Sequence, residues 1–378
     1  MRRTLQLLWE ASLHRRGIGG NLLYFLLLSL TPIYRLGLFV SQARRRARPS
    51  FARRIPVLIV GNLTTGGTGK TPMAMDLAAL LRGAGFKPAV VSRGYGRKRK
   101  RDPDVVCDWE TIILCPDEAG DEPAMMARQC QGHGISLVVG RDRVAAAELA
   151  VEKLQATALV LDDGYQQRMR FPGAWKLAMV NAAEPFGNDA LLPAGNLREP
   201  ASALGGADAV VLSHSNEVDE VKLGAIRERV RALAPGAVHV SVGYQLDWLD
   251  RGVDGTLPAE AIKGKKVMAI SAIGYPEGFE RMLEKVSGVP VMAWRAPDHH
   301  EWTSAEYRDA VQAGLRAGCE FFVTTAKDRM KIDRLGIPAV GGGVPSHALH
   351  AALVSMVDLG GKKELESVIS GYLAGLGS

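Results

Sequence analysis

A phosphate-binding loop is indicated by one stretch of the chain, Gly66-Gly67-Thr68-Gly69-Lys70-Thr71. Backbone N–H groups of its glycines and of Thr68 can point at anionic oxygens, and Lys70 supplies a positive charge. The hydroxyl of Thr71 can reach a magnesium ion bound to the same phosphates. Thr64 stands where the strict pattern has its first glycine, so the match is incomplete. We expect this stretch to bind a nucleotide; the alternative is a glycine-rich turn with a solvated lysine.

The residues on either side of the loop predict the strand and the helix that would position it. Val57–Val60 is a short apolar run rich in β-branched residues, which is typical of a buried parallel strand. After the loop, Leu77, Leu80 and Leu81 recur at helical spacing, and Pro72 suits the first turn of that helix. Strand, loop and helix in this order favour the phosphate-binding interpretation, because a chance turn would not need all three.

A pair of carboxylates follows another predicted strand. Residues 158–163 read ALVLDD, an apolar run that ends in Asp162 and Asp163. Mg²⁺ is bound by one or two carboxylates together with phosphate oxygens and water. We therefore expect Asp162 and Asp163 to hold Mg²⁺ beside the phosphate-binding loop. An acidic turn capped by Gly164 is the alternative.

Arg93 directly follows the apolar run Pro88–Ser92, which predicts a further strand. Ligands of open α/β sheets bind at the carboxyl ends of the strands, so Arg93 is predicted to face phosphate. The basic run at 97–101 could be the solvated tip of the same loop, and we expect this for its lysines, Lys98 and Lys100.

Two histidines, His299 and His300, follow a predicted strand at 289–294 and are preceded by Asp298. A single histidine at such a place is more often structural. An aspartate can fix the tautomer of a neighbouring imidazole and raise its basicity, so this group could serve proton transfer.

The N-terminal region combines an apolar stretch with flanking arginines. Residues 21–40 approach the roughly 20 residues that a membrane-spanning helix needs, but Pro32 and Arg35 interrupt them. Arginines on both sides give no orientation signal, which favours a helix that dips into one leaflet or lies in the interface. A cleaved signal peptide is not favoured, because no small-residue cleavage site follows, and a buried core helix remains an alternative. We expect membrane attachment, with the catalytic part on the cytoplasmic side.

The composition argues against a nucleic-acid partner. The chain of 378 residues carries a formal charge of +7, but few aromatic residues interleave its basic runs as stacking platforms would require. An anionic membrane surface or substrate is therefore the expected partner. The four cysteines form no metal-binding spacing, and we expect them to be reduced and buried.

Together these patterns predict an α/β protein with two domains. An N-terminal membrane-associated segment at 1–48 precedes a P-loop NTPase-type domain with a parallel sheet at 49–235. Short alternating runs at 236–264 indicate a β linker, and strands and helices resume at 265–378 as a second, smaller α/β domain.

The sequence resembles the tetraacyldisaccharide 4'-kinase family, the lipid A kinases of Gram-negative bacteria. The resemblance covers most of the chain and rests on motifs in the family's order: GNLTTGGTGKTP (61–72), SRGYG (92–96), GDEP (120–123), DDGYQ (162–166), LLPAGNLREP (191–200), AIGYPEGF (272–279) and APDHH (296–300). It implies an ATP- and Mg²⁺-dependent enzyme on the cytoplasmic face of the inner membrane, with no obligate protein partner. Such an enzyme transfers the γ-phosphoryl group of ATP to the 4'-hydroxyl of a lipid disaccharide 1-phosphate and forms lipid IVA. It also implies two α/β domains, a short β linker and an active site in the cleft.

The resemblance implies roles for individual residues as well. Lys70 and Thr71 would hold the nucleotide phosphates and magnesium, with Asp162 and Asp163 as the acidic pair at a strand end. Lys70 counts as catalytic together with Asp121, which matches the proposed catalytic carboxylate, and His299, which matches the histidine proposed to pair with it. The other family active-site positions are occupied by Arg93, Glu122, Arg143, Gln166, Arg198 and Glu199.

Three positions depart from the family pattern. Gln167 replaces a usual histidine, Tyr275 replaces a usual asparagine, and Ala326 replaces a usual glutamate. The last change puts any role for that acid in doubt.

Two other functions fit the phosphate-binding loop taken alone. A membrane-bound P-loop ATPase that acts on a protein partner would have no obvious use for the GDEP and DHH motifs. A non-catalytic nucleotide-binding module would not need an intact lysine, threonine and acidic pair.

Overall fold

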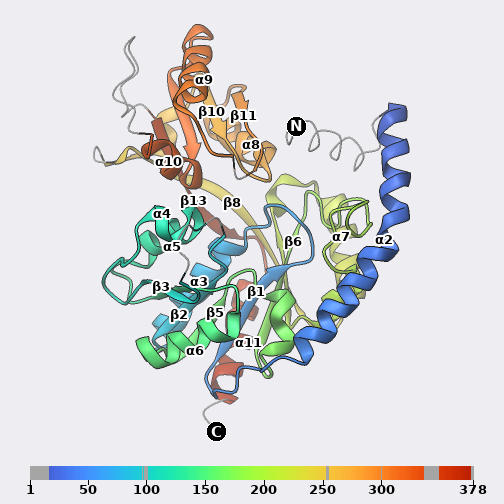
Figure 1. Cartoon of the computed structure of the whole chain (residues 1–378). Coiled ribbons are helices and arrows are strands. Elements are labelled where there is room, and N and C mark those ends of the chain that lie inside the picture. Colours follow the sequence, from blue (N-terminus) through green and yellow to red (C-terminus); the bar gives the residue numbers. More distant parts are fainter. Residues whose placement is uncertain are drawn as a thin grey trace. The chain divides into compact units, whose positions relative to one another are not determined.

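The computed structural model describes residues 17–95, 97, 101–252, 255–298, 300–335 and 349–375 of the chain. The chain divides into two compact units: unit 1 comprises Met1–Val242 and Asp358–Ser378, and unit 2 comprises Gly243–Val357. Most helices and strands of both units are labelled in Figure 1.

Unit 1 is built on a sheet whose strands run parallel, except that β3 is antiparallel to its neighbour β4. The strand order is β8-β7-β6-β1-β5-β2-β4-β3. The strands are β1 (Val57–Asn62), β2 (Pro88–Ser92), β3 (Asp104–Cys107), β4 (Ser136–Val139), β5 (Ala158–Leu161), β6 (Trp175–Asn181), β7 (Ala209–Ser213) and β8 (Val238–Asp250), of which β8 continues into unit 2. Every residue of β1, β2, β4, β5 and β7 is buried, which explains their unbroken apolar runs.

Helices alternate with these strands, as the P-loop NTPase-type prediction requires. They are α3 (Lys70–Gly83), α4 (Pro116–Ala119), α5 (Asp121–Cys130), α6 (Arg143–Leu154) and α7 (Glu220–Leu233), with short 3₁₀ helices η1 (Tyr165–Arg170), η2 (Ala201–Gly206) and η3 (Ser215–Glu217). Side chains of α6 join one buried apolar cluster with β1, and those of α7 join another with β6. The predicted α/β class of this domain is confirmed.

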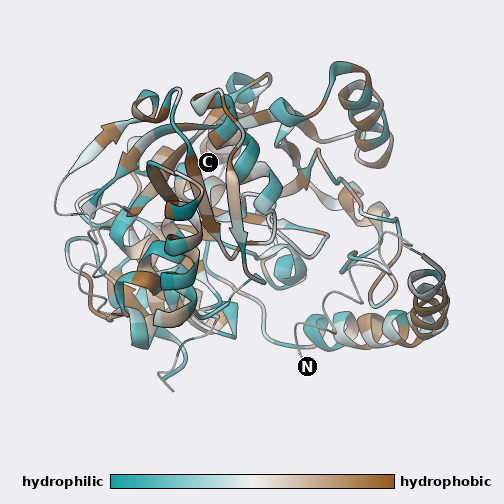
Figure 2. Cartoon of the chain, turned by 90° about the horizontal axis from the view of Figure 1, so that it is seen from above, coloured by the Kyte–Doolittle hydropathy of each residue, from teal (hydrophilic) through white to brown (hydrophobic). Residues whose placement is uncertain are grey.

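The helix α2 (Gly17–Arg46) covers the predicted apolar stretch and extends it at both ends, with Pro32 inside it. By length and composition its residues Gly19–Arg46 could cross a membrane, with a mean hydropathy of 1.7 over the best window. None of that window is buried in the protein. Figure 2 colours the ribbon by hydropathy and shows hydrophobic segments along this helix.

Unit 2 is a smaller α/β unit. Its parallel strands lie in the order β11-β10-β12-β13, and they are β10 (Val267–Ser271), β11 (Met292–Arg295), β12 (Phe321–Thr325) and β13 (Leu349–Asp358). The helices are α8 (Pro276–Ser287), α9 (Ser304–Arg316) and α10 (Ala326–Asp333). The end of β8 pairs antiparallel with β9 (Thr256–Pro258), which precedes η5 (Ala259–Ile262), so β structure lies where the linker was predicted.

The last helix, α11 (Lys362–Gly375), belongs to unit 1. The hydroxyl of Tyr372 donates to the carbonyl of Gly173 at 3.1 Å and accepts from the backbone N–H of Val57 at 3.3 Å. The predicted domain at 265–378 therefore differs from the compact unit, which ends at Val357. The difference arises because a helical pattern does not reveal which sheet the helix packs on.

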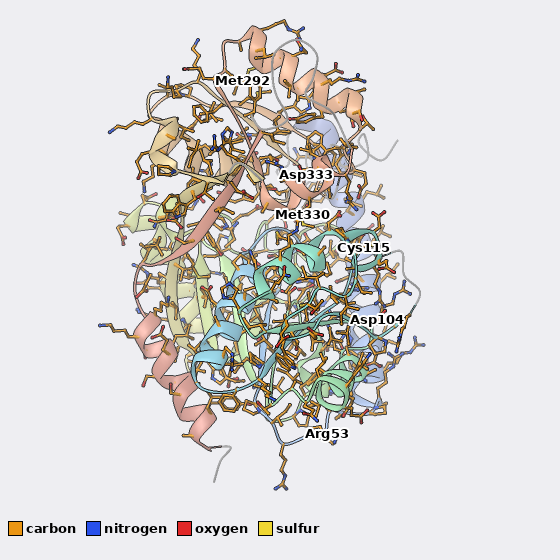
Figure 3. The ribbon with its side chains drawn as sticks, turned by 90° about the vertical axis from the view of Figure 1, so that its left-hand side faces the viewer. Arg53, Asp104, Cys115, Met292, Met330 and Asp333 are labelled. Atoms are coloured by element: carbon orange, nitrogen blue, oxygen red, sulfur yellow. The ribbon has the colours of Figure 1, made fainter. Side chains whose placement is uncertain are left out.

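The cysteines are all free thiols, and Cys107, Cys130 and Cys319 are buried as expected. Cys115 is exposed, so the prediction of burial is wrong for this residue. It is the N-cap residue of α4, its backbone N–H donates to a carboxylate oxygen of Glu118 at 3.3 Å, and it is labelled in Figure 3. A cap position at the protein surface leaves its side chain in solvent.

Gly61 of β1 packs against the backbone of Tyr165. A Cβ atom at Gly61 would lie 2.5 Å from the Cβ and 2.7 Å from the backbone N of Tyr165. Because backbone cannot give way as a flexible side chain does, we expect Gly61→Ala to lower the free energy of unfolding by about 2 kcal/mol. Gly224 lies inside α7 with open space around it, so Gly224→Ala should raise this free energy by about 0.5–1 kcal/mol. Denaturant unfolding measures both, and a Gly61→Ala protein as stable as wild type would contradict the close packing.

Candidate active site

The phosphate-binding loop joins β1 to α3, and two of its glycines adopt backbone angles that other residues rarely take. Gly66 has φ of 112° and Gly69, the N-cap of α3, has φ of 75°. Lys70 is the first residue of the helix, so the N–H groups of the first turn open toward the loop. The side chain of Thr68 is buried, and its hydroxyl has no hydrogen-bond partner.

A second loop supports the first and explains the missing glycine of the strict pattern. Thr64 forms an antiparallel β-bridge with Leu197, and the N–H of Thr65 donates to the carbonyl of Asn196 at 2.8 Å. The backbone N–H of Arg198 donates to the carbonyl of Leu63 at 2.6 Å. The LLPAGNLREP motif is therefore hydrogen-bonded to the start of the phosphate-binding loop, and Thr64 stands in extended backbone that needs no glycine.

Arg198 joins the end of β1 to the acidic pair. Its Nη2 lies 3.0 Å from Oδ1 of Asp163 and its Nη1 lies 3.2 Å from Oδ2. Nη2 also donates to the carbonyl of Asn62 at 3.2 Å and to its side-chain oxygen. A guanidinium group suits this work because its donors form a rigid fork.

Lys70 approaches the same carboxylate, with its Nζ 3.9 Å from Oδ1 of Asp163. Burial opposes ionisation of Asp163, but the charges of Lys70 and Arg198 outweigh it and lower the pKa of Asp163 to about 2. Burial also lowers the pKa of Lys70, against the opposing effect of Asp163. Asp163 is thus ionised throughout the physiological range.

Asp162 has a different environment from its neighbour. It is 3% exposed, its Oδ2 accepts from the hydroxyl of Ser92 at 3.2 Å, and its Oδ1 has no partner. Burial, followed by the charges of Glu122 and Asp163, raises the pKa of Asp162 to about 7. The site therefore holds one carboxylate whose charge is compensated, Asp163, and one, Asp162, on which the charges of Lys70 and Arg143 do not outweigh burial.

The arginines predicted to face phosphate differ in exposure. Arg143, the first residue of α6, is 3% exposed, and its Nη1 donates to the carbonyl of Gly140 at 2.5 Å. Burial lowers the pKa of Arg143 to about 10, although Asp162 and Asp163 oppose the shift, and its Nε has no partner. Arg93 follows β2 and is exposed. Arg97, the first residue of the basic run, forms an ion pair with Asp102 at 2.6 Å, and its side chain is 6% exposed.

The GDEP motif forms the turn between α4 and α5. Gly120 has φ of 90°, and a Cβ atom there would lie 2.6 Å from the carbonyl oxygen of Tyr95. The SRGYG loop therefore packs against the start of α5, whose first two residues, Asp121 and Glu122, are half-buried. The charge of Glu122 acts to raise the pKa of both Asp162 and Lys70. The first turn of α5 therefore lies close to the site.

Gln166 and Glu199 make contacts within the protein. The side-chain amide of Gln166 donates to the carbonyl of Asn62 at 2.8 Å. Glu199 is 1% exposed and accepts two hydrogen bonds from Arg168, at 2.8 and 3.2 Å. Sequence reasoning missed Arg168, Asn62 and Ser92; for Asn62 and Ser92 the available signal was a polar residue ending an apolar run.

Unit 2 carries the remaining candidate. His299 lies outside the described residues. Its neighbour His300 lies 3.1 Å from a carboxylate oxygen of Glu306, the residue that closes the capping box of α9. Asp298 pairs with Lys327 at 3.2 Å. Of the departures from the family pattern, Tyr275 is the N-cap of α8 and Ala326 begins α10, both in this unit.

Asp162 predicts how the stability of the metal-free protein depends on pH. Its pKa is about 7 when folded and near 3.8 when unfolded, so between these values only the folded protein holds the proton. The contribution of this group to stability therefore falls as pH rises from about 4 to about 7. We expect the free energy of unfolding of Asp162→Asn, measured in urea with a chelator present, to lose that slope. Parallel pH profiles for the variant and wild type would contradict the raised pKa.

The comparisons with known proteins agree with one another. The family model of tetraacyldisaccharide-1-P 4'-kinase matches residues 23–369. A tetraacyldisaccharide 4'-kinase from Anaeromyxobacter dehalogenans is 38% identical over 330 residues, which cover 87% of this chain and 85% of that protein. One from Syntrophus aciditrophicus is 36% identical over 303 residues, covering 76% of this chain and 79% of that protein.

Among solved structures, the chain is similar to LpxK from Aquifex aeolicus, crystallised in complex with ATP. The TM-score is 0.67 at 27% identity, and the match covers 93% of this chain and 99% of that one. Because the family model and these relatives all span most of the sequence, the chain belongs to the tetraacyldisaccharide 4'-kinase family.

Proposed function

We propose that this protein is an ATP-dependent kinase that phosphorylates the 4'-hydroxyl of a tetraacyldisaccharide 1-phosphate and forms lipid IVA in lipid A biosynthesis. The observation that carries the proposal is the family match over residues 23–369. The cluster of Lys70, Asp163 and Arg198 supports it, because phosphoryl transfer depends on positioned charges more than on a covalent nucleophile.

The nucleotide is ATP, held by the loop from Gly66 to Thr71. The left-handed backbone at Gly66 and Gly69 and the helix beginning at Lys70 form the kind of cradle that binds phosphates. Lys70 would neutralise charge on the β- and γ-phosphates and acts as a catalytic residue in this scheme. The relative from Aquifex aeolicus was crystallised with ATP, which supports the same ligand here.

Mg²⁺ would be held by Thr71, Asp162 and Asp163. The residues fit this ion because the buried Oδ1 of Asp162 has no hydrogen-bond partner and the charges of Lys70 and Arg143 do not offset the burial of its carboxylate. Across the part of the chain that the structure describes, no group of three or more His, Cys, Asp or Glu side chains could hold a metal. This agrees with an ion whose coordination is completed by phosphate oxygens and water. When bound, Mg²⁺ neutralises charge on the transferred phosphoryl group.

Asp121 is the proposed general base, which accepts the proton of the attacking 4'-hydroxyl. It opens α5 beside Glu122, whose charge reaches Asp162. His299 is proposed to orient Asp121 or to share its proton, on the strength of the family motif alone.

The remaining site residues divide by what they contact. Arg93 is exposed and would grip the substrate's 1-phosphate or screen the moving phosphoryl group. Arg143 and Arg198 supply positive charge from fixed positions beside the acidic pair. Gln166 and Glu199 position other residues of the protein: Gln166 binds Asn62, and Glu199 binds Arg168.

We place the enzyme at the inner membrane, attached by α2, with its site on the cytoplasmic face. The helix exposes large apolar side chains, among them Phe25, Ile33 and Phe39. A membrane surface would cover these groups and keep the acyl chains of the substrate in the bilayer. We place the site on the cytoplasmic face because the ATP that it uses is supplied from the cytoplasm.

An ATPase acting on a protein partner is not favoured. The family match covers the GDEP and DHH motifs, for which such an ATPase has no evident use. Transfer to the hydroxyl of a lipid acceptor uses a general base, the role proposed for Asp121 with His299.

Transfer of radiolabel tests the activity. Purified protein in detergent would receive γ-labelled ATP, magnesium and the lipid disaccharide 1-phosphate. We expect labelled lipid from wild type and a loss of at least about 100-fold in kcat for Lys70→Ala and for Asp121→Ala, because charge neutralisation and base catalysis each contribute about that much. Asp121→Ala should still bind ATP.

Lys153→Ala is the matched control, since this exposed lysine near the end of α6 lies outside the proposed site. It should retain full activity. ATP consumption without labelled lipid would support the ATPase instead, and near-wild-type turnover by Asp121→Ala would refute the assignment of the base.

A further inference from the structure

One face of α2 is less exposed to solvent than the rest of the helix. Partly or fully buried residues recur every three or four positions and include Gly20, Tyr24, Leu27, Thr31, Tyr34, Leu38, Ser41 and Arg45. This spacing marks a single helix face. Phe25, Ile33, Leu36 and Phe39 leave that face and are 57–69% exposed. The stripe, which contains Tyr34, Ser41 and Arg45, therefore faces the rest of unit 1, and the large apolar side chains face outward.

Two side chains of the stripe donate hydrogen bonds to backbone carbonyls elsewhere in unit 1. The hydroxyl of Tyr34 donates to the backbone carbonyl of Arg198 at 3.0 Å. Nη1 of Arg45 donates to the backbone carbonyl of Gln166 at 2.7 Å. Tyr34 and Arg45 are eleven positions apart, which in an α-helix is about three turns and a rise of about 16 Å, so both donors lie on one face.

Both acceptors belong to residues whose side chains reach the phosphate-transfer site. The guanidinium group of Arg198 binds Asp163 and Asn62, and the amide of Gln166 binds the carbonyl of Asn62. Each contact of α2 is thus one residue away from the same part of the site: Arg198 connects Tyr34 to Asn62 and Asp163, and Gln166 connects Arg45 to Asn62.

The two acceptor loops are also tied to each other. Arg168, two residues after Gln166, forms two hydrogen bonds with Glu199, the residue after Arg198. A shift of either loop would therefore be passed to the other.

The contact of Arg45 lies at the wall of a cavity of about 650 Å³ rather than in packed core. Its lining includes Ile33, Leu36, Val40, Arg44, Arg48 and Gln167. Arg45 therefore reaches the carbonyl of Gln166 from the wall of this cavity.

We propose that Tyr34 and Arg45 are positioning residues for phosphoryl transfer, which hold the backbones of Arg198 and Gln166. Through these contacts the position of α2 affects the position of the Asp163 carboxylate. Neither side chain needs to touch a substrate. The inference rests on the proposed kinase activity and adds to it a mechanical link between the membrane-facing helix and the site.

The test compares Tyr34→Phe and Arg45→Gln with wild type in the radiolabel assay, with lipid substrate in phospholipid vesicles. We expect kcat to fall about five- to tenfold in each, the effect of one lost hydrogen bond in a site that needs exact placement. The KM for ATP, the thermal midpoint and the fraction of protein bound to vesicles should stay at wild-type values. Arg45→Lys, which keeps a donor, should recover most of the activity.

Tyr24→Phe and Arg44→Gln are the matched controls, because Tyr24 lies on the same stripe and Arg44 is the exposed neighbour of Arg45. Both should keep the wild-type kcat. The inference is overturned if Tyr34→Phe and Arg45→Gln turn over like these controls, or if their loss is accounted for by weaker vesicle binding. Absence of labelled lipid from wild type would overturn the kinase proposal itself, which distinguishes the two failures.

Discussion

The contact of Arg198 with Asp163 and Asn62 is the interaction on which the site depends. Asn62 ends β1 and Asp163 follows β5, two neighbouring parallel strands. One guanidinium group spans both strand ends and lies on the loop that is hydrogen-bonded to the phosphate-binding loop. Without it, the ion pair that Asp163 keeps among the described residues is the one with Lys70, at 3.9 Å. Arg198 thus holds Asp163 relative to the phosphate-binding loop.

The two adjacent aspartates show how position divides chemical roles. Cations hold the pKa of Asp163 near 2 against the effect of burial, whereas burial beside Glu122 raises that of Asp162 to about 7. When Asp162 is ionised, the folded protein therefore holds a buried carboxylate that nearby cations compensate only in part, which costs stability in the absence of ligand. Such a local conflict between stability and charge is expected where a cation binds.

Local patterns in the sequence predicted the elements that build the site. Val57–Val60 lies in β1, Leu77 and Leu81 are buried in α3, and Asp162 follows β5 directly. These elements were accessible because apolar runs and helical spacing are local signals. The contacts that hold the site residues in place could not be predicted from such local signals. Arg168 and the hydrogen bonds to the carbonyls of Arg198 and Gln166 depend on loops far apart in sequence, and a backbone acceptor leaves no mark in residue type.

The division of unit 1 into two sequence segments has a consequence for how the protein is made. Residues 358–375, with Tyr372 bonded to Val57 and Gly173, emerge from the ribosome only after all of unit 2. Domains that are continuous in sequence can complete their folding in order as synthesis proceeds. Here the nucleotide-binding unit gains α11 after the inserted unit has been translated, while α2 is translated before every strand of that unit. The helix that could contact a membrane is therefore synthesised well before the nucleotide-binding unit is complete.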